Sequence, residues 1–238
     1  NRRSRGLGDV YKRQALQRAA TQAIHDGLAR IESSPDYAHL TYEQYHSGEE
    51  HDQPDYLQAA VVVIDNWTGS IRAAVGGRDH HDSQFNRLWH ARRPAGTAFV
   101  PFVYASAFEM PNFSPRTKVL DAPLNNRQVM IGGQSGILGE WGVDDAQNRY
   151  EGEITAAMAL LRGKNAATIR VGNEAGLANV KTLSRAVGIE SQLRDYPSTV
   201  LGSSEVTLLE LTRAYAAIAN EGRGAPSPSL VGRIAAPN

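Results

Sequence analysis

The densest group of potential metal ligands in the sequence is the run Asp79-His80-His81-Asp82. Carboxylate oxygens and imidazole nitrogens both bind divalent metal ions such as Zn2+. In an extended segment consecutive side chains alternate between two sides, so two of these residues would converge only in a special turn. We therefore interpret the run as a solvated loop, and we expect neither a metal ion nor a cofactor in this chain.

The overall composition excludes further kinds of chemistry. The 238 residues contain 25 basic and 25 acidic side chains, so a formal net charge of zero gives no electrostatic basis for binding nucleic acid or an anionic membrane surface. Cysteine is absent, which excludes disulfides and thiolate metal sites. No apolar run approaches the roughly 20 residues of a membrane helix, so we expect any membrane anchor outside this chain.

The first 14 residues are expected to lie outside the folded part. They show no apolar periodicity, and the stretch from Gly6 to Gln14 resembles translated sequencing-adapter read-through. The alternative is a natural, disordered basic tail. In both cases residues 1–14 are excluded from the prediction of the fold.

A helix and an acidic linker are predicted for residues 15–56. Apolar residues recur at helical spacing between Ala15 and Ile31, which predicts a helix with one buried face. From Glu32 to Tyr56 the sequence is rich in Asp and Glu and contains neither Lys nor Arg. Pro and Gly interrupt this stretch, so we interpret it as a solvated linker.

Residues 57–238 are predicted to form a domain that begins with strands and continues with helices. The β-branched run at 61–64 and the segment Ile71 to Val75 predict a hairpin. The last helix begins with a capping box at Thr207 and ends at Gly222. Further helices are predicted at Gly96–Met110, Ile154–Leu161, Asn165–Asn173 and Ala178–Val187. Strands followed by helices favour an α+β fold.

Several blocks in residues 57–238 resemble one protein family, in the order that the family shows. Besides the hairpin they are Val75-Gly76-Gly77-Arg78-Asp79, Ser83-Gln84-Phe85-Asn86-Arg87, Pro101-Phe102-Val103-Tyr104, Tyr150-Glu151-Gly152 and Leu201-Gly202-Ser203-Ser204-Glu205-Val206-Thr207. The pattern is similar to the transpeptidase domain of class A penicillin-binding proteins. The resemblance implies the α+β fold shared with β-lactamases, truncated to its N-terminal strand hairpin and helical part. With the C-terminal strands missing, we expect an exposed strand edge and marginal stability.

The chemistry of that family depends on three motifs. The first is a Ser nucleophile followed three residues later by a Lys that helps to take its proton. The second is Ser-x-Asn, which relays protons and binds a substrate amide, and the third is Lys-Thr-Gly. In this sequence the first motif falls on Thr97 and Val100, and the second falls on Gly163 and Asn165, so that only the Asn is retained. The third motif is not found, and the resemblance places it beyond residue 238.

A shifted alignment does not restore the first motif. None of the lysines is preceded three residues earlier by Ser or Thr, and the lysines are Lys12, Lys118, Lys164 and Lys181. Thr97 is therefore either a nucleophile with an unidentified base or, as we favour, the N-cap of the following helix. Lys164 either replaces the lost Lys or is exposed to solvent, as lone lysines usually are. Asn165 either binds a peptide amide or caps its own helix.

Together these features favour a transpeptidase module of peptidoglycan biosynthesis that is catalytically inactive, a pseudoenzyme. The alternative is an active D,D-transpeptidase or carboxypeptidase that attacks D-alanyl-D-alanine stem peptides through Thr97 with a substitute base. A third hypothesis is a module that only binds peptidoglycan or a cell-division partner. The resemblance implies a parent chain at the periplasmic face of the cytoplasmic membrane, with an upstream glycosyltransferase domain, whose partners are stem peptides or β-lactams.

Overall fold

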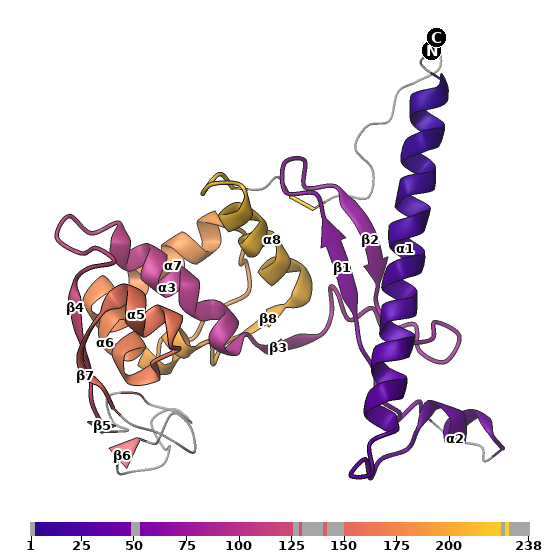
Figure 1. Ribbon diagram of the computed structural model, residues 1–238, viewed down its shortest axis with the longest axis horizontal. Helices are drawn as coiled ribbons and strands as arrows, with labels where there is room; N and C mark the ends of the chain where they lie inside the picture. Colours follow the sequence, from indigo (N-terminus) through magenta and orange to yellow (C-terminus); the bar gives the residue numbers. More distant parts are fainter. Residues whose placement is uncertain are drawn as a thin grey trace. The chain divides into compact units, whose positions relative to one another are not determined.

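The structure is a computed structural model of the 238-residue chain, and it describes residues 3–48, 53–125, 129, 140–141, 150–224 and 227–228. The chain divides into two compact units, drawn in Figure 1. One consists of residues 1–92 and 207–238, and the other of residues 93–206. Both contain helices and strands, which confirms the predicted α+β class. The predicted boundary at residue 57 falls inside the first unit.

The predicted hairpin forms the sheet of the first unit. β1 (Val61–Ile64) and β2 (Ile71–Val75) pair antiparallel, with a bulge between Val63 and Ile64. Asp65 organises the turn, because its Oδ1 accepts hydrogen bonds from the Thr68 N–H at 2.9 Å and from the Thr68 hydroxyl at 2.8 Å. The Arg72 guanidinium donates to the other carboxylate oxygen at 2.8 Å. These hydrogen bonds, that of Arg72 first, lower the pKa of Asp65, so the carboxylate stays ionised at neutral pH.

Helix α1 (Arg3–Glu32) packs along β2, as Figure 1 shows. The face that it buries includes Ala20, Ile24 and Leu28, at the predicted helical spacing. The helix already begins at Arg3, so it includes most of residues 1–14, for which an adapter-derived or disordered tail was predicted. Extending a formed helix costs far less than nucleating one, so residues without apolar periodicity can continue it. The origin of this segment stays a prediction.

The Gln17 side chain of α1 covers part of the outer edge of β2. Its Nε2 donates to the Ala74 carbonyl, and the Ala74 N–H donates to its Oε1, both at 3.0 Å. The outer edge of β2 is therefore covered at Ala74. Among the described residues, no strand pairs with the other edge of β1.

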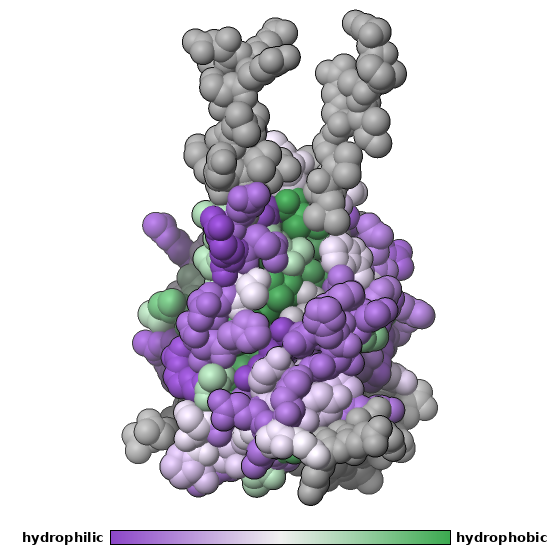
Figure 2. Space-filling view, turned by 90° about the vertical axis from the view of Figure 1, so that its right-hand side faces the viewer, coloured by the Kyte–Doolittle hydropathy of each residue, from purple (hydrophilic) through white to green (hydrophobic). Residues whose placement is uncertain are grey.

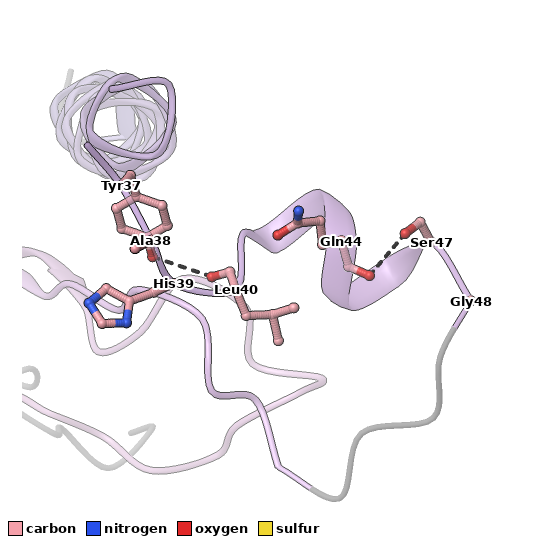
Figure 3. Close-up of a pocket in the computed structure, with 7 residues that line it drawn as sticks. All are labelled: Tyr37, Ala38, His39, Leu40, Gln44, Ser47 and Gly48. Atoms are coloured by element: carbon pink, nitrogen blue, oxygen red, sulfur yellow. Dashed lines mark hydrogen bonds between the residues drawn. The ribbon is translucent and has the colours of Figure 1, made fainter. Parts of the chain in front are cut away.

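The acidic linker contains a short helix, α2 (Tyr42–His46), that the sequence prediction missed. Its signal is a capping box, in which Gln44 N–H donates to Thr41 Oγ1 at 3.2 Å and Thr41 N–H donates to Gln44 Oε1 at 2.9 Å. An open hollow of about 800 Å3 lies beside this helix (Figure 3), lined by Tyr37, Ala38, His39, Leu40, Gln44, Ser47 and Gly48.

The second unit is built around α3 (Val100–Phe108) and α6 (Asn165–Ala175), which pack against each other. The helices α5 (Ala156–Leu161) and α7 (Leu177–Ala186) contact both of them, and so does the 3-10 helix η3 (Pro197–Leu201). The large, fully buried side chains of this core include Phe99, Phe102, Tyr104, Ile169, Val171 and Val200.

Short strands flank these helices. β4 (Lys118–Asp121) pairs antiparallel with β7 (Gly152–Thr155). The helix predicted from Ile154 is thus wrong at its start, since Thr155 ends β7 and caps α5 through a hydrogen bond from Met158 N–H. The other pairs are β5 (Leu124–Asn125) with β6 (Glu140–Trp141), and β3 (Arg92–Pro94) with β8 (Glu205–Thr207).

The last helix, α8 (Leu208–Ala219), belongs to the first unit and contacts β1. Its predicted capping box is confirmed, because Glu210 N–H donates to Thr207 Oγ1 at 3.2 Å and Thr207 N–H donates to Glu210 Oε2 at 2.9 Å. In the described part of the chain, no helix combines the length and the apolar character that crossing a bilayer requires. The face drawn in Figure 2 is mostly hydrophilic, with a narrow apolar strip.

Candidate active site

Thr97 lies in a short 3-10 helix, η1 (Gly96–Phe99), that runs directly into α3. The Gly96 N–H donates to the Gly202 carbonyl at 2.9 Å. Gly202 has a φ of +74°, and a Cβ on it would lie 2.1 Å from the Gly96 oxygen. Only glycine permits this close approach, so Gly202 fixes the position of the segment from Gly96 to Val100, here called the Thr97 turn.

Thr97 is exposed, and it does not cap a helix. The N-cap of η1 is Ala95 and that of α3 is Phe99, and neither makes a side-chain cap hydrogen bond. The N-cap interpretation of Thr97 is wrong because the 3-10 turn begins at Gly96 and places Thr97 inside it. Among the described residues, no side chain is hydrogen-bonded to the Thr97 hydroxyl.

Val100, where the resemblance predicts the family's Lys, follows Thr97 by one 3-10 turn. Its N–H donates to the Thr97 carbonyl, which realises the spacing of three residues as a single turn. The Val100 side chain is 6% exposed, in the same buried segment as Phe99 and Phe102. An aliphatic group can neither accept nor donate a proton, so this turn keeps the backbone of the motif without its proton acceptor.

The second motif lies in the turn between α5 and α6. Gly163, where the resemblance predicts the Ser of this motif, has a φ of +63°, and nothing lies within 4 Å of a Cβ built on it, so there is open space at this position. Asn165 is the first residue of α6, whose N-cap is Lys164. The interpretation of Asn165 as a cap is therefore wrong. Because α3 packs against both α5 and α6, the two motifs lie on neighbouring elements.

Lys164 is not exposed, contrary to the favoured interpretation. Its side chain is 14% exposed, and its Nζ lies 3.4 Å from Asp121 Oδ2 and 3.1 Å from Glu151 Oε1. Asp121 is fully buried at the end of β4, and its Oδ2 also accepts a hydrogen bond from the Glu151 N–H at 3.0 Å. The lysine therefore forms a partly buried ion-pair cluster with these two carboxylates, here called the Lys164 cluster.

The electrostatics of the Lys164 cluster keep the amine protonated. Burial lowers the pKa of Lys164, but the hydrogen bond with Glu151 and the attraction of Asp121 outweigh it, so the pKa is raised. The pKa of Glu151 is lowered, chiefly by its hydrogen bond with Lys164. A cation held by two carboxylates is a poor proton acceptor, so Lys164 is unsuited to replace the lost base.

Sequence reasoning missed the Lys164 cluster. Tyr150-Glu151-Gly152 is one of the blocks that carried the resemblance, but no local pattern relates it to Asp121. The connection comes from the β4–β7 register, in which Asp121 lies opposite Gly152 and hence beside Glu151. Such long-range pairing has no signal in one sequence.

Comparison with known proteins shows which family this chain is similar to. The profile described as "Penicillin binding protein transpeptidase domain" matches residues 59–236. Penicillin-binding protein 1A of Neisseria gonorrhoeae is 36% identical over 171 residues, which is 71% of this chain and 21% of that protein. Penicillin-binding protein 1A of Rickettsia conorii is 33% identical over 167 residues, 70% of this chain and 20% of that protein. The chain thus spans about a fifth of these relatives.

Solved structures are similar as well. The crystal structure of penicillin-binding protein 1A from Haemophilus influenzae matches with a TM-score of 0.58 and 27% identity, over 67% of this chain and 23% of that chain. Penicillin-binding protein PonA1 from Mycobacterium tuberculosis matches with a TM-score of 0.62 and 21% identity, over 89% of this chain and 50% of that chain. The second likeness concerns the fold alone.

Proposed function

Because the chain belongs to the transpeptidase-domain family of class A penicillin-binding proteins, we propose that it is a non-catalytic transpeptidase module of a peptidoglycan-synthesis protein. The observation that carries this proposal is the pair of Thr97 and Val100. Attack of a hydroxyl on an amide or β-lactam carbonyl needs a base for the hydroxyl proton. The exposed Thr97 hydroxyl has no such base hydrogen-bonded to it among the described residues, and the base position holds a buried valine.

The Lys164 cluster supports the same proposal. Lys164 is the middle residue of the second motif, and it is engaged by Asp121 and Glu151. Releasing it would leave the buried Asp121 carboxylate without its cation, which is costly in a low-dielectric interior. A swing of Lys164 toward Thr97 is therefore disfavoured.

The parent protein is proposed by analogy with the relatives. We place it at the periplasmic face of the cytoplasmic membrane, with a glycosyltransferase domain before the present chain and residues 15–56 in the connection between domains. Peptidoglycan stem peptides and β-lactams are its proposed ligands, bound without acylation. Asn165, the retained residue of the second motif, is the residue we propose for contact with a peptide amide.

Turnover of a D-alanyl-D-alanine peptide tests the proposal. The purified chain is compared with its Thr97→Ala variant and with penicillin-binding protein 1A of N. gonorrhoeae as the positive control. We expect release of D-alanine by the control only, with the chain no faster than its own variant. Turnover by the chain that disappears in Thr97→Ala would contradict the proposal and favour an active D,D-peptidase. Circular dichroism of both samples ensures that folded protein is compared.

A further inference from the structure

Three potential metal ligands converge in the first unit, whereas the residues at the motif positions belong to the second unit. They are His46 of α2 and two carboxylates of the loop after β2, Asp79 and Asp82, and their ligand atoms all lie within 4.8 Å of one another. His46 Nε2 is 3.3 Å from Asp82 Oδ2. We propose that this group, here called the His46 cluster, binds one divalent transition-metal ion such as Zn2+.

A turn brings the two carboxylates together. The Ser83 N–H donates to the Asp79 carbonyl at 3.2 Å, and the His81 N–H donates to Asp79 Oδ1 at 2.8 Å. Asp79 and Asp82 are half-buried by this turn, while His80 and His81 between them are exposed. The interpretation of the whole run as a solvated loop is thus wrong for the two aspartates, because the segment is a turn and not an extended strand.

The orientation of His46 suits a ligand. Its Nδ1 lies 2.9 Å from the Tyr42 carbonyl, and a carbonyl can only accept, so Nδ1 carries the proton. In the neutral ring the lone pair then belongs to Nε2, the atom that faces Asp82. A backbone carbonyl that fixes the ring of a histidine through its second nitrogen is the usual support of a metal-binding imidazole.

Two tyrosines hold the carboxylates in place. The Tyr42 hydroxyl donates to Asp79 Oδ2 at 3.0 Å, and the Tyr56 hydroxyl donates to Asp82 Oδ2 at 2.5 Å. Each carboxylate is therefore positioned by a neutral donor. Hydrogen bonds of this kind orient metal-ligating carboxylates and preserve their charge for the ion.

The charge of the His46 cluster also favours a divalent cation. The cluster contains two carboxyl groups and one imidazole and no cationic Lys or Arg side chain. The nearby Arg78 is engaged elsewhere, since its Nη1 and Nη2 donate to Glu32 at 2.5 and 2.9 Å and its guanidinium lies over the Tyr42 ring at 4.5 Å. No Lys or Arg occurs from Glu32 to Tyr56. A divalent ion would neutralise the cluster.

The donor set selects the class of metal. One imidazole nitrogen with two carboxylate oxygens suits Zn2+ and neighbouring first-row ions, whereas Mg2+ and Ca2+ prefer oxygen ligands alone. Three protein ligands leave further coordination positions for water. The bound ion would connect α2 to the loop after β2 and thereby fasten the acidic linker to the hairpin of the same unit.

Isothermal titration of the complete chain, made without a histidine tag, with ZnCl2 tests the proposal. We expect one equivalent of Zn2+ to bind, MgCl2 to give no comparable binding, and His46→Ala and Asp82→Asn each to weaken the Zn2+ affinity at least tenfold. His80→Ala and His81→Ala are the matched controls, because these imidazoles belong to the same turn and lie outside the cluster. Both should bind Zn2+ like the unaltered chain.

Several outcomes would overturn the proposal. They are an unaltered chain that does not bind Zn2+, a His46→Ala variant that binds like the unaltered chain, and controls that lose as much affinity as His46→Ala. Since His46→Ala also removes a ring packed 4.3 Å from the Tyr42 ring, its fold is checked by circular dichroism. If it does not fold, the isosteric Asp82→Asn variant decides.

Discussion

The Thr97 turn and the His46 cluster differ in what they retain. At the Thr97 turn the backbone is closely specified, because Gly202 lies against Gly96 and the turn leads Thr97 to Val100 at motif spacing. Its side chains nevertheless offer one exposed hydroxyl and an aliphatic group. In the His46 cluster the ligating groups converge, and two tyrosines hold the carboxylates. The difference shows that backbone geometry and side-chain chemistry are separable: the Thr97 turn has the motif spacing without a proton acceptor at residue 100, whereas the His46 cluster brings polar groups together.

The largest expected effect is seen when the Thr–Val pair is moved into an active relative. In penicillin-binding protein 1A of N. gonorrhoeae, replacing the Ser and Lys of the first motif by Thr and Val removes the proton acceptor. We expect the rate of acylation by a fluorescent penicillin to fall about 10²–10⁴-fold, the usual contribution of a general base. The single Ser→Thr variant separates the added methyl group from the lost base. An unchanged rate of acylation in the double variant would contradict the claim that a Thr–Val pair lacks the necessary base.

The next effect tests how strictly the backbone of the Thr97 turn is specified. Gly202→Ala places a Cβ against the backbone of Gly96 at a positive φ, and we expect about 3 kcal/mol of destabilisation in urea unfolding. Gly163→Ala is the matched control, since its φ is also positive but no atom lies within 4 Å. It should cost only about 1 kcal/mol. Equal losses in both variants would show that the contact with Gly96 is unimportant.

A third prediction concerns the Lys164 cluster. Lys164→Met keeps the length of the side chain but leaves the buried Asp121 carboxylate without its cation, so we expect a loss of about 2–3 kcal/mol in the free energy of unfolding. Lys181→Met is the control, because its partner Asp195 is 86% exposed and such pairs contribute about 0–1 kcal/mol. If both variants unfolded alike, Lys164 would not be held by Asp121 in solution.

The smallest expected effect concerns the His46 cluster. Tyr56→Phe removes the hydroxyl that donates to Asp82, and we expect the Zn2+ affinity to fall about tenfold, as for other groups that orient metal ligands. Tyr37→Phe is the control, since its hydroxyl donates to the Leu40 carbonyl and not to the cluster. Titration calorimetry measures both. Equal affinities would mean that the tyrosine does not position the carboxylate.

Local patterns predicted much of the fold. The β-branched run at 61–64 and the capping box at Thr207 depend on neighbouring residues, and both elements are present as predicted. The assignment of Thr97, Val100 and Gly163 to motif positions depends on the resemblance and stays a prediction. Their residue types alone show that Val100 and Gly163 have no side-chain group that can accept a proton.

The remaining features depend on contacts between segments far apart in the chain. Lys164 was expected at the surface, because nothing near it in the sequence points to Asp121 or Glu151. His46 was overlooked because its partners follow β2, and the segment that holds them was assumed to be extended. The N-cap role assigned to Thr97 was wrong since the hydrogen bond between Gly96 and Gly202, which starts the turn earlier, joins two distant loops.

The central claim is that the Thr97 hydroxyl has no base to activate it. The most direct test is the intact mass of the folded chain after long incubation with excess penicillin, followed by peptide mapping. We expect an unchanged mass for the chain and a gain of one penicillin for penicillin-binding protein 1A of N. gonorrhoeae under the same conditions. A stable gain of one penicillin on the peptide that contains Thr97 would contradict it.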